Sequence, residues 1–241
     1  MLVKLENPSL FSKAIEIISD LVTEVRIKVN EFGLSIVAID PANVAMVGFK
    51  LPKSAFSQFE SDEEVLGVNL DDLKKILKRS NSRSSVNLQK EENTLKIEIL
   101  ERVKRNFTLG LIEIEHEEKD FPSLDFSSKI EMNSSDLIDS IEDCSIVADA
   151  CSFIIREGKF IIEAKGINSA FAEFSSDEVK IEAENCKSRY SLEYLSKFIK
   201  GAKLSEKASI KFANEHPLRM DFKTEGIELS FILAPRAETD D

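Results

Sequence analysis

Histidine is the side chain most often used for acid–base chemistry near neutral pH, and this sequence has two, His116 and His216. Neither belongs to an HExxH or HxH pattern, and the sequence lacks the GxxxxGKS/T and GxGxxG phosphate loops and the GxSxG elbow. His216 directly precedes Pro217, which is more typical of a loop or strand end than of a catalytic base. Acidic residues are so frequent that carboxylate pairs arise by chance. We therefore expect neither an enzyme nor a metal site.

The cysteines predict no site either. Cys144, Cys151 and Cys186 are odd in number and widely spaced, with no CxxC pair, which fits neither a disulfide framework nor zinc. The residues from Met1 to Glu6 do not resemble a signal peptide, and no apolar run reaches the roughly 18 residues that span a membrane. We expect a cytoplasmic protein with no cofactor and no membrane partner.

Basic residues, by contrast, recur at matching positions of two predicted helices. Together with one residue of the first helix and one that follows the fourth, the set is Lys13, Lys75, Lys78, Arg79, Lys197, Lys200 and Lys203. A single such helix would indicate an ordinary solvated face. The recurrence favours a basic track that faces phosphates. These helices carry no aromatic or amide side chains arranged to read bases, so contact would be independent of sequence.

The overall composition limits how such a track is used. The 32 Lys and Arg oppose 44 Asp and Glu, a net charge of −12, whereas a protein that simply coats nucleic acid is normally basic. With 42% hydrophobic residues the chain is globular, not disordered. A length of 241 residues suits one large domain or two small ones.

The elements that would position these side chains follow from apolar periodicity. Four segments have the period of a helix, the first with Asn7 or Ser9 as its cap: 9–20, 71–79, 134–149 and 191–200. Other segments alternate apolar and polar residues, which is typical of strands with one buried face: 25–29, 34–38, 95–99, 112–115, 153–155, 160–162, 179–181, 210–212 and 227–231. Many strands with four short helices predict an α+β fold.

The order of these elements occurs twice. The segment 68–78 reappears in pattern at 190–200, with the shared frame Leu, acid, any, Leu, any, Lys, apolar, apolar, Lys. The first helix matches the third at a similar spacing, close to half the chain. We predict two similar domains, each a curved antiparallel sheet carrying two helices, at 1–117 and 131–241.

A connecting loop is predicted at 118–130. It is polar and contains a proline, yet it carries Phe121, Leu124 and Phe126. A plain spacer does not need three large apolar side chains. They either pack back on the domains or form part of a docking surface.

Three motifs carry a resemblance to a known family. They are the segment 67–79 (GVNLDDLKKILKR), an Asp-Pro-x-x-Val turn that begins at Asp40, and the closing strand 231–236 (FILAPR), which Pro217 and Leu218 precede. The chain resembles the archaeal sliding clamps, the family of proliferating cell nuclear antigen. The resemblance covers essentially the whole chain, and the length, the duplication and the position of the joint agree with it.

The resemblance implies a ring of three subunits with helices lining the hole and sheets forming the outer wall. Such a ring encircles duplex DNA, tethers DNA polymerase and raises its processivity, without catalysing a reaction. The implied partners are a second and third copy of the chain, duplex DNA, and, through short peptide motifs, DNA polymerase, flap endonuclease and ligase-type enzymes; a clamp loader opens the ring. The implied location is the nucleoid in the cytoplasm of an archaeal cell. Retention by topology allows weak affinity for DNA, and tethering raises the effective concentration of partners.

The basic residues of the second and fourth helices match hole-facing positions of the family, as does Lys13. The third helix departs from relatives that place bases there, because it carries Asp136, Asp139, Glu142, Asp143 and Asp149 and no base. We therefore expect DNA contact mainly from the second and fourth helices.

The resemblance also implies an apolar pocket for partner peptides beside the joint. Its residues would be Ile39, Asn43, Val44, Met46, Phe121, Leu124, Phe126, Pro217, Leu233, Ala234 and Pro235. For Val44, Met46 and Leu233 the alternative is a role only in the core. For Phe121 and Phe126, which lie on a polar linker, docking is favoured.

Subunit contacts are implied between sheet edges. A strand around 107–115 would meet a neighbour's strand around 169–175, and an unpaired edge would otherwise invite aggregation. The residues implied are Arg83, Arg105, Phe107, Leu109, Asp139, Asp143, Phe171 and Phe174. Among them, Arg83 and Arg105 would pair with Asp139 and Asp143 of the next subunit. Isolated exposed pairs contribute only about 0–1 kcal/mol each.

Three alternatives stay open. The first is a checkpoint-type clamp of the same fold, which the Leu-Ala-Pro tail and compact loops disfavour. The second is a subunit of a heterotrimeric clamp, although both halves of a subunit interface favour self-association. The third is an acidic β-rich enzyme, which predicts a convergent His and carboxylate cleft or a metal cleft.

Overall fold

The computed structural model of the chain describes residues 1–115 and 119–237. His116 and the predicted domain boundary between residues 117 and 118 lie outside these residues. The chain forms two compact units that are not continuous in sequence. Unit 1 comprises Met1–Pro41, Val47–Phe121 and Glu225–Leu229, and unit 2 comprises Ala42–Met46, Pro122–Thr224 and Ser230–Asp241.

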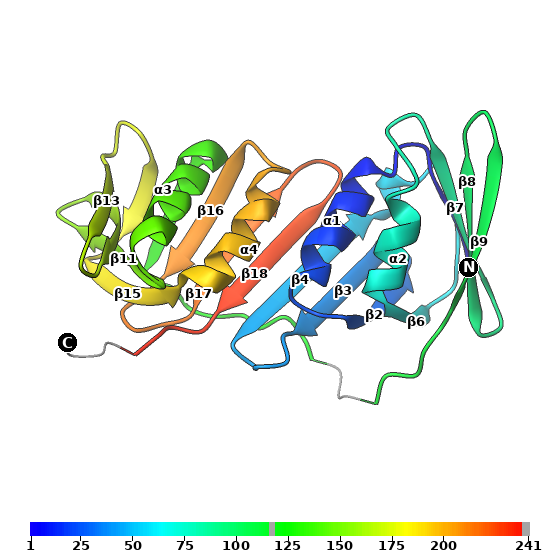
Figure 1. Cartoon of the computed structure of the whole chain (residues 1–241), viewed down its shortest axis with the longest axis horizontal. Coiled ribbons are helices and arrows are strands. Elements are labelled where there is room, and N and C mark those ends of the chain that lie inside the picture. Colours follow the sequence, from blue (N-terminus) through cyan, green and yellow to red (C-terminus); the bar gives the residue numbers. More distant parts are fainter. Residues whose placement is uncertain (116–118, 238–241) are drawn as a thin grey trace. The chain divides into compact units, whose positions relative to one another are not determined.

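Unit 1 contains two runs of hydrogen-bonded strands and two helices (Figure 1). One run has the order β5-β1-β7-β8-β9, with β5 Gln58–Glu60, β1 Leu2–Leu5, β7 Ser85–Glu91, β8 Thr94–Leu100 and β9 Lys104–Gly110. The other has the order β4-β3-β2-β6, with β4 Ala45–Pro52, β3 Gly33–Ile39, β2 Glu24–Asn30 and β6 Glu64–Asn69. The helices are α1 Ser9–Ser19 and α2 Leu70–Leu77, and a short 3₁₀ turn, η1, covers Lys53–Ala55.

Burial in unit 1 follows the predicted periods. In β8 the side chains of Leu95, Ile97 and Ile99 are buried, while Lys96 between them is exposed. In α1 the buried side chains recur along one face. The predicted cap of α1, Asn7 or Ser9, is wrong, because the N-cap is Pro8, which makes no side-chain cap hydrogen bond. The Asn7 carboxamide does accept a hydrogen bond from the backbone N–H of Ser9, at 3.0 Å.

Unit 2 repeats the plan with two runs of strands and two helices (Figure 1). One run has the order β14-β10-β16-β17-β18, with β14 Lys180–Ala183, β10 Ser128–Asn133, β16 Lys207–Phe212, β17 Leu218–Lys223 and β18 Glu228–Leu233. The other has the order β13-β12-β11-β15, with β13 Ser169–Phe174, β12 Lys159–Lys165, β11 Ala150–Arg156 and β15 Cys186–Ser191. The helices α3 Ser134–Val147 and α4 Leu192–Ala202 pack on each other and on strands of both runs.

Aromatic side chains fill the core of unit 2. The ring of Phe153 lies edge-on to Phe160, Tyr190 and Phe212, at centroid distances of 5.5–6.0 Å. Phe198 on α4 stacks on Phe231 with centroids 4.4 Å apart. These contacts fix α4 on the sheet, because aromatic pairs add directional attraction to the burial of apolar area.

The α+β class and the four helices are confirmed, with helix ends shifted by at most two residues. The strand predicted at 112–115 is wrong, because residues 111–115 belong to no strand and β9 ends at Gly110. The Ile114 carbonyl accepts a hydrogen bond from the Arg26 guanidinium, and the Ile112 N–H donates to the Gly67 carbonyl at 3.0 Å. A side chain therefore occupies a backbone acceptor that a strand ladder would use, although the alternation imitates a strand.

Candidate functional site

The basic surface of unit 1 rests on the pairing of α1 with α2. The Asn69 carboxamide caps α2 by accepting hydrogen bonds from the N–H groups of Asp71 and Asp72, at 3.0 and 3.2 Å. Those two carboxylates lie in the first turn, where the helix dipole favours negative charge. Leu70, Leu73 and Leu77 are buried, so the lysines between them point away from the core.

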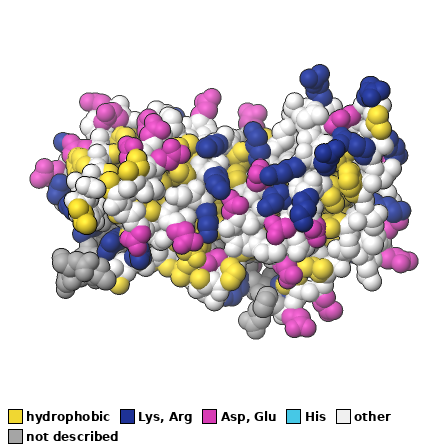
Figure 2. All heavy atoms as spheres, in the orientation of Figure 1, with side chains coloured by type: hydrophobic (Ala, Val, Ile, Leu, Met, Phe, Trp, Pro, Cys, Tyr) yellow, Lys and Arg dark blue, Asp and Glu magenta, His cyan; other side chains and the backbone are white. Residues whose placement is uncertain are grey.

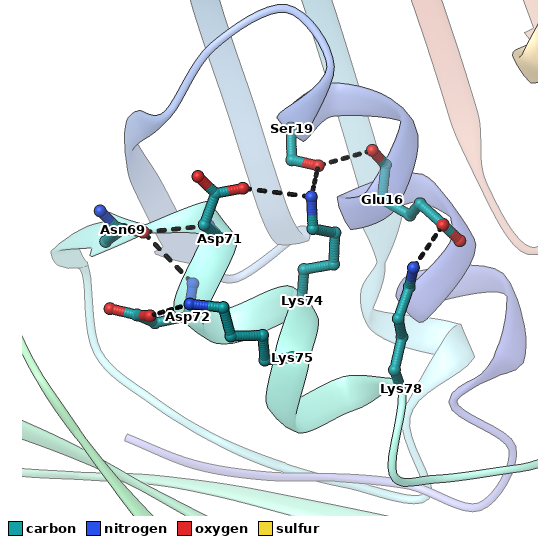
Figure 3. A network of polar contacts seen from close by, with 8 residues as sticks. All are labelled: Glu16, Ser19, Asn69, Asp71, Asp72, Lys74, Lys75 and Lys78. Atoms are coloured by element: carbon teal, nitrogen blue, oxygen red, sulfur yellow. Dashed lines mark hydrogen bonds and ion pairs between the residues drawn. The ribbon is translucent and has the colours of Figure 1, made fainter.

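The lysines of α2 differ in what they contact (Figure 3). Lys74 is only 23% exposed and reaches both the Asp71 carboxylate, at 3.1 Å, and the Ser19 hydroxyl on α1, at 3.0 Å. Lys75 is 72% exposed and pairs with Asp72, and Lys78 pairs with Glu16 of α1 at 2.6 Å. Lys74 thus joins the helices, whereas Lys75 and Lys78 remain accessible to a ligand.

On α4 the predicted basic residues lie outside the set of buried apolar side chains that packs on the sheet. Lys197 is half-buried, lies 5.1 Å above the centre of the Tyr194 ring and pairs with Glu193. Lys200 and Lys203 are exposed at the end of the helix, where positive charge complements the dipole. Lys13 and Arg79 in unit 1 are exposed as well.

In unit 1, dark blue Lys and Arg side chains gather over the two helices, and in unit 2 they lie over α4 (Figure 2). α3 carries none, as its sequence predicts. Acids pair with Lys75, Lys78 and Lys197, so part of the basic charge is already neutralised within the chain. A polyanion would have to compete with these carboxylates, which suits weak contact.

Four of the residues predicted for the peptide pocket line one hollow in unit 2, of about 520 Å³. They are Val44, Leu233, Ala234 and Pro235, and the Ala234 N–H donates to the Val44 carbonyl at 2.8 Å. Leu233 is only 1% exposed, so it forms part of the floor and belongs to the core. The other lining residues were not predicted: Ser145, Ala148, Asp149, Ser191, Leu192, Glu193, Tyr194, Ser196 and Arg236.

An ion pair ties the tail to the end of α3 beside this hollow. The Arg236 guanidinium lies 2.9 Å from the Asp149 carboxylate, and the Arg236 N–H donates to the Arg189 carbonyl at 2.7 Å. The hydrogen bond from Arg236 and its positive charge lower the pKa of Asp149. The position of Arg236, directly after the Leu-Ala-Pro motif, is the sequence signal for its role; nothing marks Ser145 or Ala148.

The aromatic residues of the joint pack back on their units and stay half-exposed. In unit 2 the Phe126 ring lies edge-on to His216 at 5.5 Å, and the His216 carbonyl accepts hydrogen bonds from the Tyr190 and Ser188 hydroxyls. In unit 1 the Phe121 ring lies so close to Gly48 that a Cβ there would meet it at 2.8 Å. His216 therefore has a structural partner, not the neighbours of a catalytic base.

The other pocket candidates divide between the units. In unit 2, Asn43 is exposed in a turn with φ of 58°, and Met46, Leu124 and Pro217 are half-buried. In unit 1, Ile39 is half-buried at the end of β3. Each therefore leaves part of its side chain open to a ligand.

The two strands predicted at subunit contacts both end a run of strands. β9 ends its run in unit 1 and β13 ends its run in unit 2. Phe171 is 58% exposed on β13, whereas Phe174 stacks on Phe160 and Leu109 is buried. Phe107 lies half-buried opposite Ile97. An exposed phenylalanine on an unpaired edge is a liability unless a partner covers it.

The four charged interface candidates are not equally available. The Arg105 guanidinium pairs with Glu101 of the same strand connection at 3.0 Å. Within residues 1–115 and 119–237, the side chains of Arg83, Asp139 and Asp143 are exposed and form no ion pair. These three are therefore the candidates with unused charge.

Catalytic chemistry gains no support from the described residues. No group of three or more His, Cys, Asp or Glu side chains among them is placed to hold a metal ion. All three cysteines are buried and unpaired, and burial raises the pKa of the Cys151 thiol, which disfavours the reactive thiolate. Within the same residues, no helix is long and apolar enough to cross a bilayer.

Comparison with known families covers the whole described chain. Residues 1–120 match the family model described as proliferating cell nuclear antigen, N-terminal domain, and residues 120–237 match the C-terminal domain. The chain is 38% identical over 243 residues to a protein of Pyrococcus furiosus named DNA polymerase sliding clamp, covering 97% of each. It is 37% identical over 238 residues to DNA polymerase sliding clamp 1 of Thermococcus kodakarensis, covering 95% of each.

Solved structures agree on the fold. A crystal structure of proliferating cellular nuclear antigen from Entamoeba histolytica superposes with a TM-score of 0.91 at 24% identity, covering 98% of both chains. A chain of the PCNA2–PCNA3 complex from Sulfolobus tokodaii has a TM-score of 0.89 at 27% identity, covering 99% of this chain and 100% of that one.

Proposed function

Because this chain belongs to the proliferating cell nuclear antigen family, whose sliding clamps are non-enzymatic processivity factors of replication, we propose that three copies close into a ring around duplex DNA. The ring tethers DNA polymerase and raises its processivity. The observation that carries this proposal is the match of both clamp domains to consecutive parts of the chain, together with relatives similar over nearly their full length.

The basic residues of the helices face the DNA in this proposal. Exposed lysines on α2 and α4, with Lys13 on α1, contact phosphates weakly and without regard to sequence. The competing carboxylates Asp72, Glu16 and Glu193 keep each contact weak, so the ring slides. Retention comes from closure, which explains how a chain of net charge −12 works on DNA.

Partner enzymes bind at the hollow of unit 2 and the apolar residues predicted with it. A short peptide with an aliphatic residue and aromatic rings fits an apolar floor such as Leu233 beside the exposed backbone of Ala234 and Pro235. We propose this site for the polymerase, the clamp loader, and flap endonuclease and ligase-type enzymes at the nucleoid.

Subunits meet edge to edge, with β9 of one copy beside β13 of the next. Pairing of these edges would cover Phe171 and satisfy the outward backbone groups of both strands.

We propose two domains, at residues 1–117 and 131–241, which a connecting loop at residues 118–130 joins.

Light scattering over a range of protein concentrations tests the proposal. A species near three times 27.1 kDa supports a self-sufficient homotrimer. That species should then stimulate a DNA polymerase on primed circular single-stranded DNA in the presence of a clamp loader. A trimer without stimulation would contradict the clamp role.

The second candidate is a subunit of a heterotrimeric clamp. One similar structure is a complex of two different PCNA chains, which makes this alternative specific. A protein that stays monomeric at every concentration would favour it over the homotrimer.

A further inference from the structure

A second hollow, of about 410 Å³, lies on the sheet of unit 2 and has no part in the proposed clamp function. We call it the β10–β17 groove, and it is lined by Lys129, Glu131, Lys207, Ala208, Ser209, Lys211, Arg219, Asp221 and Lys223. Five of these side chains are basic and two are acidic, whereas the whole chain carries −12. The groove is thus a local reversal of the charge of the protein.

The groove faces away from the helices. On the same three strands, the buried residues Ile130, Ile210 and Met220 occupy the alternate positions, and α3 and α4 pack against these strands. Because side chains alternate across a strand, the odd-numbered positions 129, 211 and 219 point to the other face. The basic helix surface and the groove are therefore separate sites.

The strand register arranges the charges in rows. Lys129 lies opposite Lys211, which lies opposite Arg219, so three bases stand side by side across β10, β16 and β17, and Glu182 on β14 lies opposite Lys129 at the end of this row. The next row on this face is Glu131, Ser209 and Asp221. Beyond it, Lys207 on β16 and Lys223 on β17 are basic again.

The middle row neutralises only part of this charge. Glu131 pairs with Lys129 at 2.9 Å, and Asp221 accepts hydrogen bonds from Arg219, at 2.9 Å, and from the Ser230 hydroxyl. The Lys211 ammonium is 3.7 Å from Asp221. Asp221 is buried and already contacts Arg219, Lys211 and the Ser230 hydroxyl, so it cannot compensate all the bases around it.

A row of like charges has a cost that the fold does not require. Like charges directly opposite each other on neighbouring strands destabilise a sheet, whereas opposite charges stabilise it. A bound anion would attract Lys129, Lys211 and Arg219 and so offset the repulsion among them. The arrangement therefore suits a ligand more than it suits the isolated sheet.

The lining residues indicate the class of that ligand. Lysines predominate and no aromatic side chain is present, whereas single-stranded nucleic acid is normally held by stacking on aromatic rings. The two basic rows are four residues apart on β16, about 13 Å along the strand. An extended peptide with acidic residues at positions i and i+4 spans that distance, and the acidic middle row disfavours an acid at i+2.

We propose that the β10–β17 groove binds an acidic peptide segment of a partner protein, with Asp or Glu at i and i+4 and an uncharged residue at i+2. Lys129 and Lys211 meet one end of the segment, and Lys207 and Lys223 meet the other. The Ser209 hydroxyl lies between the two ends.

Fluorescence polarisation of a labelled Glu-Glu-Ser-Glu-Glu peptide tests the proposal with the full-length protein at low ionic strength. The double variant Lys129→Gln with Lys211→Gln should weaken binding about tenfold, since surface charges act strongly when the Debye length is about 30 Å. The control Lys96→Gln with Lys165→Gln removes the same net charge from exposed strand positions that do not line the groove, and should leave binding within about twofold because Coulomb attraction falls with distance.

Several results would overturn the proposal. The first is equal binding of the peptide by the two double variants, and the second is no binding of the peptide at low salt. The third is that an oligothymidylate binds more tightly than the peptide and that Lys129→Gln with Lys211→Gln abolishes this binding. The last would assign the groove to nucleic acid. If the first double variant melts earlier than the control, Lys207→Gln with Lys223→Gln replaces it with the same expectation.

Discussion

Single lysines on neighbouring turns of one helix have different roles. Lys74 is held between Asp71 and Ser19 and fastens α2 to α1, whereas Lys78, one turn later, is exposed and opposes Glu16. The repeat already separates the two, because Lys74 stands where the second copy has Ser196, whereas Lys78 matches Lys200. Their contacts indicate that Lys74→Ala would loosen the helix pair and Lys78→Ala would change the surface charge.

The double change Lys78→Ala with Lys200→Ala should lower polymerase stimulation, and more at high salt than at low salt. Salt weakens the remaining phosphate contacts, so the loss of two bases matters most there. The first substitution also leaves Glu16 without its lysine, which adds repulsion. Stimulation measured across a salt series, with Lys96→Ala and Lys165→Ala as the control pair, checks this. Equal activity throughout would remove both residues from a DNA role.

The Asp149 carboxylate should titrate below its ordinary pKa of 3.8, because Arg236 donates a hydrogen bond to it and lies close with positive charge. A lowered pKa means that the pair stabilises the folded chain above pH 3.8 and that this contribution is lost as the pH falls through the lower value. NMR titration of the Asp149 side chain measures it. Arg236→Ala should return the pKa toward 3.8, and an unchanged value would contradict the assigned cause.

At the scale of elements, a glycine decides how the segment after β9 approaches β6. A Cβ at Gly67 would lie 2.0 Å from the carbonyl oxygen of Ile112, while the Ile112 N–H bonds to the Gly67 carbonyl. Only a residue without a side chain allows two backbones to approach so closely. The family motif therefore begins with a glycine for a structural reason.

Gly67→Ala should destabilise the protein by about 1–3 kcal/mol, because the contact is with backbone and cannot be relieved by rotating a side chain. Gly110→Ala is the control, since a Cβ there meets nothing within 4 Å. Urea unfolding at one protein concentration measures both. Equal midpoints for the two variants would refute the close approach.

The whole molecule has an acidic average and basic local surfaces. The net charge of −12 disfavours a protein that coats DNA, yet Lys and Arg gather over the helices of unit 1 and over α4 in unit 2 (Figure 2). The proposed ring would resolve this difference, because closure would replace affinity. In that proposal β9 and β13, which both end a run of strands, pair with neighbouring copies.

Assembly should respond to charge at the proposed subunit contact. Asp143→Arg should weaken the trimer, since it would place a second cation against Arg83 of the next copy. The swap Asp143→Arg with Arg83→Asp should restore it, and sedimentation velocity over a dilution series measures both. Arg105 is a poorer partner because Glu101 already holds it. Unchanged assembly in the single variant would exclude Asp143 from the contact.

The sequence by itself determined the α+β class, the four helices and the family, because apolar periods and the segments 67–79 and 231–236 are local properties of the chain. It misjudged 112–115, where alternation occurs without a strand. The predicted DNA, peptide and subunit residues stay predictions.

Only the tertiary structure decided which charges remain available and which residues share a hollow. Lys78 meets Glu16, and Arg236 meets Asp149, across long separations in sequence. The rows of the β10–β17 groove likewise arise from strand register, which joins Lys129 to Lys211 and Arg219. Periodicity reports which face of an element is buried, but the pairing of distant elements depends on packing that no local pattern records.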